Sequence, residues 1–204
     1  FSCTMLIVMT LMLMLYVAGA KITHFLILSV PAIVGIAALV IKAPYRMARV
    51  VTFLDPFKDI QGKGWQIVQS LYAIGSGGLF GAGLGQSRQK YLNIPEPQND
   101  FIFSILAEEF GLLGSILVML MFIFLIERGV KIALKAPDLF GTLLATGIIS
   151  MIAIQALVNI AVVTSSMPVT GMPLPFFSYG GTALAITMTE MGIVLNISKY
   201  SRLS

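Results

Sequence analysis

Long apolar runs dominate the sequence, and they constrain its fold more than any other feature. A helix needs about 20 mostly apolar residues to cross the hydrocarbon core of a membrane. Only 11% of the 204 residues are charged, against about 25% in soluble domains. We therefore expect an all-α, polytopic membrane protein that forms one membrane domain over residues 1–204. Its five expected spans cover residues 5–20, 25–41, 101–126, 139–163 and 181–197.

Basic residues in the short loops predict how these spans are oriented. Arg128, Lys131 and Lys135 lie between the third and fourth spans, whereas residues 164–180 contain no Lys, Arg, Asp or Glu. Short cytoplasmic loops are enriched in Lys and Arg. We therefore expect the long segment 42–100 and the loop 164–180 to lie together on the extracytoplasmic side of the cell membrane.

The N-terminal run does not have the features of a cleavable signal peptide, because no basic region precedes it. Phe1 opens directly into apolar sequence, so we expect a chain cut from a longer polypeptide. Cys3 and His24 are the only residues of their types. An intrachain disulfide and a His/Cys zinc cluster are thereby excluded.

The segment 42–100 combines an amphipathic helix with a glycine-rich run. Trp65, Val68, Leu71 and Tyr72 recur at helical spacing within residues 64–74, which predicts a helix that lies on the membrane surface or against the spans. Six glycines among the next eleven residues permit tight turns and a close backbone approach. The Lys-Ser/Thr pair of a P-loop does not follow them, so we expect no nucleotide site. We also expect no nucleic acid as partner.

Three carboxylates near the start of the third span are candidates for chemistry. Asp100 stands where the polar segment meets the apolar run. It is either a helix cap or a carboxylate at the mouth of a membrane cavity, where partial desolvation suits it to proton abstraction. Glu108 and Glu109 lie inside the expected span. Carboxylates are costly there, so these two either serve function or pair to hold helices together.

The segment 42–100 is also basic, with seven Lys or Arg residues against four acidic ones. A basic surface outside the membrane favours an anionic partner, either lipid headgroups or a substrate that carries a pyrophosphate. Arg46 and Arg49 are one helical turn apart and can hold one phosphate together. The basic residues are Lys42, Arg46, Arg49, Lys58, Lys63, Arg88 and Lys90.

Several stretches, in order along the chain, resemble the SEDS family of membrane glycosyltransferases, which includes FtsW, RodA and SpoVE. The residues around Arg46 and the ending 196–201 look most similar to FtsW and SpoVE of Gram-positive spore formers. Because family members have roughly twice as many spans, the resemblance implies the C-terminal half of such a protein. The matching stretches are 64–78, 83–90, Pro95-Glu96, Asp100-Phe101-Ile102-Phe103, 107–111 and 174–181.

The resemblance implies a peptidoglycan glycosyltransferase that polymerises lipid II at the outer leaflet, with Asp100 as the general base. Asn99 stands where the family usually has Thr. A divalent cation, Mg or Mn, is a further expectation, without an organic cofactor. Glu108 and Glu109 would support the site from within the membrane. The residues expected to bind substrate are Arg46, Arg49, Lys63, Arg88, Lys90, Glu96 and Ser178.

Expected partners are lipid II and a class B penicillin-binding protein, which is a transpeptidase, within the divisome, the elongasome or the spore cortex machinery. Two other functions stay open. A flippase for lipid-linked precursors also needs carboxylates and a cavity inside the membrane. A scaffold that regulates a transpeptidase needs no chemistry of its own. An O-antigen ligase-like transferase is a weaker alternative, because its motifs are absent.

Overall fold

The computed structural model describes residues 2–60, 62, 64–89 and 98–201, without the side chains of residues 28, 32, 33, 36, 37, 39–42, 45 and 46. Every regular element in this part of the chain is helical, which confirms the predicted all-α class. The elements are α1 (Ser2–Val17), α2 (Ile22–Lys42), α3 (Pro44–Leu54), the 3₁₀ helix η1 (Pro56–Asp59), α4 (Trp65–Ser76), α6 (Ile102–Leu134), α7 (Leu139–Val163) and α8 (Gly181–Tyr200).

Among the described helices, α6, α7 and α8 are long and apolar enough to cross a membrane, whereas α1 and the stretch Ile22–Pro31 of α2 are shorter. The bounds of α7 match the expected span 139–163, but α6 continues past Ile126 to Leu134. Lys131 pairs there with Glu127, one turn earlier, and such pairs stabilise helices beyond their apolar part. The count of five spans stays a prediction.

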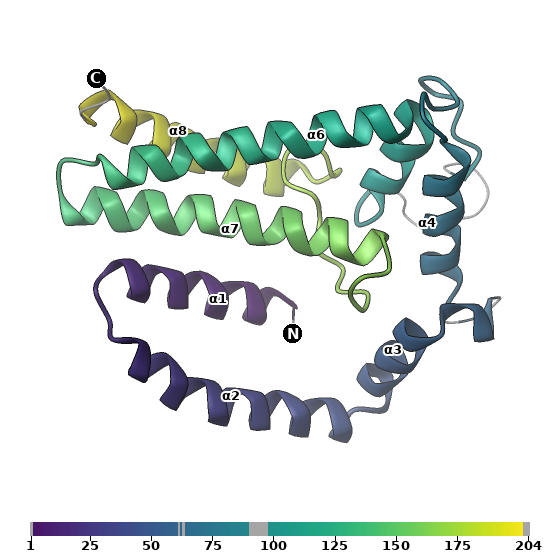
Figure 1. Ribbon diagram of the computed structural model, residues 1–204, viewed down its shortest axis with the longest axis horizontal. Coiled ribbons are helices and arrows are strands. Elements are labelled where there is room, and N and C mark those ends of the chain that lie inside the picture. The colour runs from purple at the N-terminus through teal and green to yellow at the C-terminus, as the bar shows by residue number, and fades with distance from the viewer. Residues whose placement is uncertain (1, 61, 63, 90–97, 202–204) are drawn as a thin grey trace.

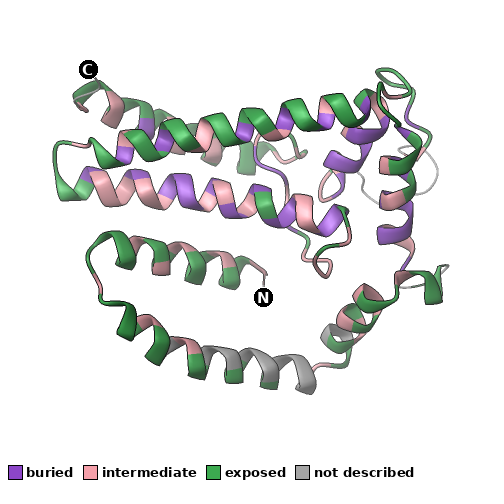
Figure 2. Cartoon of the chain, in the orientation of Figure 1, coloured by how far each residue is buried: buried purple, intermediate pink, exposed green. Residues whose placement is uncertain are grey.

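Helix α7 lies at the centre of the bundle, with α6 on one side and α1 on the other (Figure 1). Ile149 and Ile152 of α7 form one core cluster with Phe122 of α6 and Val194 of α8. Burial is concentrated along α7, α4 and one side of α6, whereas α1 and α8 are mostly half-buried or exposed (Figure 2). The core therefore holds α6 and α7 as a rigid pair.

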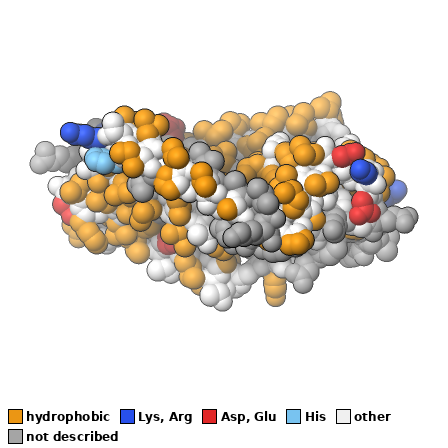
Figure 3. Space-filling view, turned by 90° about the horizontal axis from the view of Figure 1, so that it is seen from below, with side chains coloured by type: hydrophobic (Ala, Val, Ile, Leu, Met, Phe, Trp, Pro, Cys, Tyr) orange, Lys and Arg blue, Asp and Glu red, His pale blue; other side chains and the backbone are white. Residues whose placement is uncertain are grey.

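The exposed surface of the bundle is largely apolar. Leu117 and Ile123 of α6 and Leu195 of α8 are among many large apolar side chains that point outward. Among the side chains coloured in Figure 3, hydrophobic ones predominate, and the charged ones drawn there lie mainly toward the two ends of the view. An apolar surface of this extent suits lipid and not water. The chain is a membrane protein.

Helix α4 confirms the helix predicted around residues 64–74, but its buried face differs from the predicted one. Val68 is buried as expected, whereas Tyr72 is half exposed. Ser70 is fully buried, donates to the carbonyl of Val163 (2.8 Å) and shares a hydrogen bond with Ser104 (2.6 Å). The helix crosses one end of α6 and α7 (Figure 1), because these polar contacts turn it toward them.

Helix α6 is broken at Gly111, where φ is 71° and ψ is −166°. In a regular helix the amides of Leu112 and Leu113 would donate to the carbonyls of Glu108 and Glu109. Here they donate instead to the carbonyls of Gly78 (2.9 Å) and Leu79 (3.2 Å). The carbonyls of Glu108 and Glu109 in turn accept from the amides of Ala82 (2.9 Å) and Gly83 (3.0 Å). The glycine-rich loop thus satisfies all four of these groups.

This exchange of hydrogen bonds requires glycine on both sides. A Cβ atom at Gly77 would overlap the carbonyl oxygen of Ala107, and one at Gly81 would overlap that of Glu109. Gly81 and Gly111 also adopt positive φ angles of 80° and 71°, which other residues reach at a cost. The predicted close backbone approach of the glycine run is confirmed.

The break divides the predicted third span into two parts, which the sequence analysis did not anticipate. Residues 112–134 form the long continuous part, which extends about 34 Å at 1.5 Å per residue and is long enough to cross a membrane. Glu108 and Glu109 lie before the break. Their predicted position inside the membrane stays a prediction, because the whole helix Ile102–Leu134 is apolar enough to be a span.

We predict that Gly77→Ala destabilises the fold while Gly75→Ala does not. Both residues lie at the end of α4 without a positive φ, but the space around Gly75 is open whereas Gly77 touches the backbone of Ala107. Overpacking costs about 1–3 kcal/mol, and Gly→Ala within a helix gains up to about 1 kcal/mol. Thermal unfolding in detergent measures both. Equal midpoints for the two variants would contradict the close backbone contact.

Candidate active site

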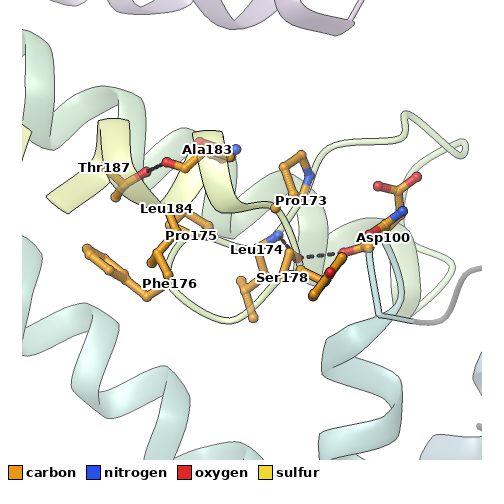
Figure 4. Close-up of a pocket in the computed structure, with 13 residues that line it drawn as sticks. Asp100, Pro173, Leu174, Pro175, Phe176, Ser178, Ala183, Leu184 and Thr187 are labelled. Atoms are coloured by element: carbon orange, nitrogen blue, oxygen red, sulfur yellow. Dashed lines mark hydrogen bonds between the residues drawn. The ribbon is translucent and has the colours of Figure 1, made fainter. Parts of the chain in front are cut away.

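Asp100 lies directly before α6, at one end of a cavity of about 220 Å³ (Figure 4). Phe101, and not Asp100, is the N-cap residue of α6. The other walls come from the loop after α7, from α7 itself and from the first turns of α8. The lining residues are Asn99, Asp100, Gln155, Pro173, Leu174, Pro175, Phe176, Ser178, Tyr179, Gly180, Ala183, Leu184 and Thr187.

The segment that carries Asp100 is held against the loop 164–180 by hydrogen bonds. Ser178 Oγ donates to the carbonyl of Asn99 (2.5 Å) and accepts from the amide of Leu174 (2.7 Å). The amide of Tyr179 donates to the carbonyl of Gln98 (2.8 Å). The two segments thus line one cavity. Ser178 lines the cavity, and its predicted contact with substrate stays a prediction.

The Asp100 carboxylate is close to the backbone of the same loop at Gly171. A Cβ atom at Gly171 would lie 3.4 Å from Asp100 Oδ2, and the φ of this glycine is 71°. Phe176 also has a positive φ, of 68°, which is uncommon outside glycine. Strained backbone conformations persist only where surrounding contacts enforce them. The loop is therefore shaped by its contacts with residues 98–100.

Glu108 is 3% exposed, and both of its carboxylate oxygens accept hydrogen bonds. Ser87 Oγ donates to Oε2 (2.5 Å) and the amide of Arg88 donates to Oε1 (3.0 Å). Glu109 is half-buried, and its Oε1 lacks a hydrogen-bond partner among the described residues. Glu108 therefore anchors the loop that carries Arg88, whereas Glu109 makes no comparable hydrogen bonds to the described residues.

The structure describes only part of the predicted basic set. Arg49 on α3 is exposed, and its Nη1 donates to the carbonyl of Val169 in the loop 164–180 (3.0 Å). The side chain of Arg88 is exposed. Arg46 lies one turn before Arg49 on α3, but its side chain is not described. The predicted residues Lys63, Lys90 and Glu96 lie outside the described residues.

The described side chains form no cluster of metal ligands. The described part of the chain contains no group of three or more His, Cys, Asp or Glu residues that would hold a metal ion. Asp100 alone would be a single ligand, and magnesium is usually held by one or two carboxylates together with substrate phosphates. The divalent cation stays a prediction, and no chemical step below depends on it.

Two residues that matter for the site were not predicted for it. Asn159 donates from its side-chain amide to the carbonyls of Asp100 and Met172. Gln155, one turn earlier on α7, lines the cavity. Two amide side chains one turn apart in an apolar helix are the signal that marks this face.

Comparisons with known proteins agree on one family. A family model for FtsW, RodA and SpoVE, described as "Cell cycle protein", matches residues 1–203. Stage V sporulation protein E of Bacillus subtilis (strain 168) is 55% identical over 193 residues, which cover 95% of this chain and 53% of the relative. The "Probable peptidoglycan glycosyltransferase FtsW" of Geobacter sp. (strain M18) is 44% identical, covering 93% of this chain and 52% of the relative.

A solved structure supports the same grouping. It is described as "Structural coordination of polymerization and crosslinking by a peptidoglycan synthase complex" and matches with a TM-score of 0.76 and 30% identity. The match covers 100% of this chain and 57% of the solved one. The chain spans about half the length of the curated relatives that it matches.

We predict that Glu108→Gln lowers the unfolding temperature and Glu109→Gln does not. The first substitution weakens two charge-assisted hydrogen bonds, which are worth about 1.5–3 kcal/mol each. The second neutralises a carboxylate that has one buried oxygen without a partner among the described residues. Thermal unfolding of both variants in the same detergent is the measurement. A larger decrease in unfolding temperature for Glu109→Gln than for Glu108→Gln would show that Glu108 does not anchor the loop.

Proposed function

The chain belongs to the FtsW, RodA and SpoVE family of cell cycle proteins, and from this premise we propose that it carries the catalytic centre of a peptidoglycan glycosyltransferase. The substrate is lipid II, which the enzyme joins into glycan strands. The observation that carries the proposal is Asp100, held at the end of a cavity whose other walls come from α7, from the loop after it and from the first turns of α8. Relatives named as probable peptidoglycan glycosyltransferases support it.

In the proposed reaction Asp100 is the general base. The 4-hydroxyl oxygen of the acceptor sugar attacks the anomeric carbon of the donor, and its proton passes to the Asp100 carboxylate. The bond between the anomeric carbon and the pyrophosphate oxygen breaks, and the lipid pyrophosphate leaves. One carboxylate suffices for this inverting displacement, because the leaving group is already good and needs no protonation by a second acid.

The leaving pyrophosphate gains negative charge and needs cations nearby. Arg88 and Arg49 are both exposed. Arg49 donates to the carbonyl of Val169 in the loop 164–180, and the backbone amide of Arg88 donates to Glu108. Arg46, Lys63, Lys90 and Glu96 complete the proposed substrate-binding set, and Ser178 adds a polar group to the cavity wall. A divalent cation, Mg or Mn, would add positive charge to the pyrophosphate.

The placement of the carboxylates favours the transferase over a flippase. A transporter needs polar groups distributed through the bilayer. Asp100, Glu108 and Glu109 instead all lie before the break of α6, and the long part that follows carries Glu127 as its only acidic residue. Glu190 lies within α8. The gathering of three carboxylates at one end of α6, with Asp100 at the cavity, favours chemistry at one face of the membrane over transport.

We propose that this face is extracytoplasmic and that the partner is a class B penicillin-binding protein. The solved relative belongs to a complex that coordinates polymerisation and crosslinking, and a transpeptidase would supply the crosslinking. The relatives named for sporulation and for FtsW favour the spore cortex machinery or the divisome over the elongasome.

The proposal predicts that Asp100→Asn abolishes polymerisation of purified lipid II by the full-length protein in detergent or nanodiscs. The substitution keeps the shape of the side chain and removes the base, and general bases contribute about 10²–10⁴-fold in rate. Asp138→Asn is the matched control, because Asp138 is exposed in the turn before α7 and should keep full activity. If Asp100→Asn keeps more than a tenth of the wild-type activity, Asp100 is not the general base.

The proposed orientation predicts the labelling pattern of single cysteines on a Cys3→Ala background. A cysteine at Lys58 or Ser165 should react with a membrane-impermeant maleimide added to intact cells, and one at Lys135 should react only after permeabilisation. Lys58 and Lys135 are exposed and Ser165 is half-buried. If only the cysteine at position 135 reacts from outside, the topology is the reverse of the proposed one, and the site does not face substrate at the outer leaflet.

A further inference from the structure

Asn159 is a polar residue in the apolar interior of the bundle. It lies in the last turn of α7 between Val158 and Ile160, and only 1% of its surface is exposed. Its Nδ2 group donates two hydrogen bonds, to the carbonyl of Asp100 (2.8 Å) and to the carbonyl of Met172 (2.7 Å). One amide thus connects the rigid centre of the bundle with both segments that form the cavity wall.

The two carbonyl acceptors determine which way the amide group points. In the flipped orientation Oδ1 would face two carbonyl oxygens, and neither contact would contain a proton. In the orientation observed, Oδ1 is buried without a partner among the described residues. A buried acceptor without a partner destabilises a fold. An apolar residue at this position would avoid that cost but would remove the donor that the carbonyls of Asp100 and Met172 share, so the position is occupied by Asn for these two hydrogen bonds and not for packing alone.

The two carbonyl groups that accept hydrogen bonds from Asn159 belong to the two segments that meet at the Asp100 carboxylate. Asp100 itself provides one carbonyl, and the residue before Met172 is Gly171, which lies next to Asp100 Oδ2. Ser178 joins the same two segments at Asn99. Asn159 differs from Ser178 because it belongs to α7, whose side chains form the packed core. Its hydrogen bonds therefore attach both segments to the core.

We propose that Asn159 is a positioning residue that places the Asp100 base relative to the cavity wall. This inference rests on the proposed function of Asp100. A base accelerates proton transfer only within hydrogen-bond reach of the proton that it removes, and a misplacement of about 1 Å can cost about 10²-fold in rate. Asn159 does not touch the reacting atoms, so its loss should lower kcat while substrate binding is largely kept.

The test compares Asn159→Leu and Asn159→Asp with Ser150→Ala in the full-length protein. Leu and Asp are close to Asn in size, and neither offers an amide group to the two carbonyls. Ser150 is the matched control, because it is a buried polar residue of α7 whose hydroxyl bonds only locally, to the carbonyl of Gly147. Steady-state polymerisation of lipid II gives kcat and KM. Amide hydrogen exchange gives the order of residues 98–101 and 171–179.

We expect both Asn159 variants to lose about 10²-fold in kcat with KM changed by less than about threefold, and to exchange faster in both segments. Ser150→Ala should match the wild type in all three quantities. Wild-type kcat in either folded variant, or unchanged exchange in both segments, would overturn the positioning role. If Asn159→Leu does not fold, Asn159→Asp alone is judged by the same criteria.

The design separates this inference from the proposed function. If Asp100→Asn retains activity, the base assignment fails, and the exchange data still decide whether Asn159 holds the two segments. If Asp100→Asn is inactive and the Asn159 variants are fully active, only the positioning role fails.

Discussion

The exchange of backbone hydrogen bonds at Gly111 is the interaction on which the described site depends. A helix that breaks inside an apolar bundle leaves amide and carbonyl groups without partners, and in a membrane environment such groups are costly. The loop after α4 supplies two carbonyls and two amides to replace them. Because glycines allow the backbones to touch, the break is tolerated, and the loop acquires a fixed position in return.

Two consequences of the break determine the surroundings of Asp100. The short part of α6 before Gly111 is free to pack against α4, where Ser104 meets Ser70, and it carries Asp100 at its start. Glu108, on the same part, holds Ser87 and the amide of Arg88. Asp100 and Arg88 lie in different segments of the sequence, but the short part of α6 before Gly111 positions both of them.

Helix α7 is the second element that positions the residues of the site. It is the most buried of the long helices, and near its end Asn159 holds the segments of Asp100 and Met172. Ser178 and Tyr179 add hydrogen bonds between the same segments. A cavity wall made of two loops acquires a defined shape when a packed helix holds both, since loops are otherwise the more mobile parts of a protein.

The sequence by itself determined the helical class, the bounds of α7 and the presence of α4, and it singled out Asp100 as a candidate, because apolar length, periodicity and motif order are local properties of a chain. Only the tertiary structure decided where α6 breaks, which face of α4 is buried and what Glu108 and Asn159 bind. These depend on backbone groups from distant segments: Gly111 looks like any helical glycine until Gly78 and Leu79 accept its neighbours' hydrogen bonds. Side-chain patterns carry no record of such partners.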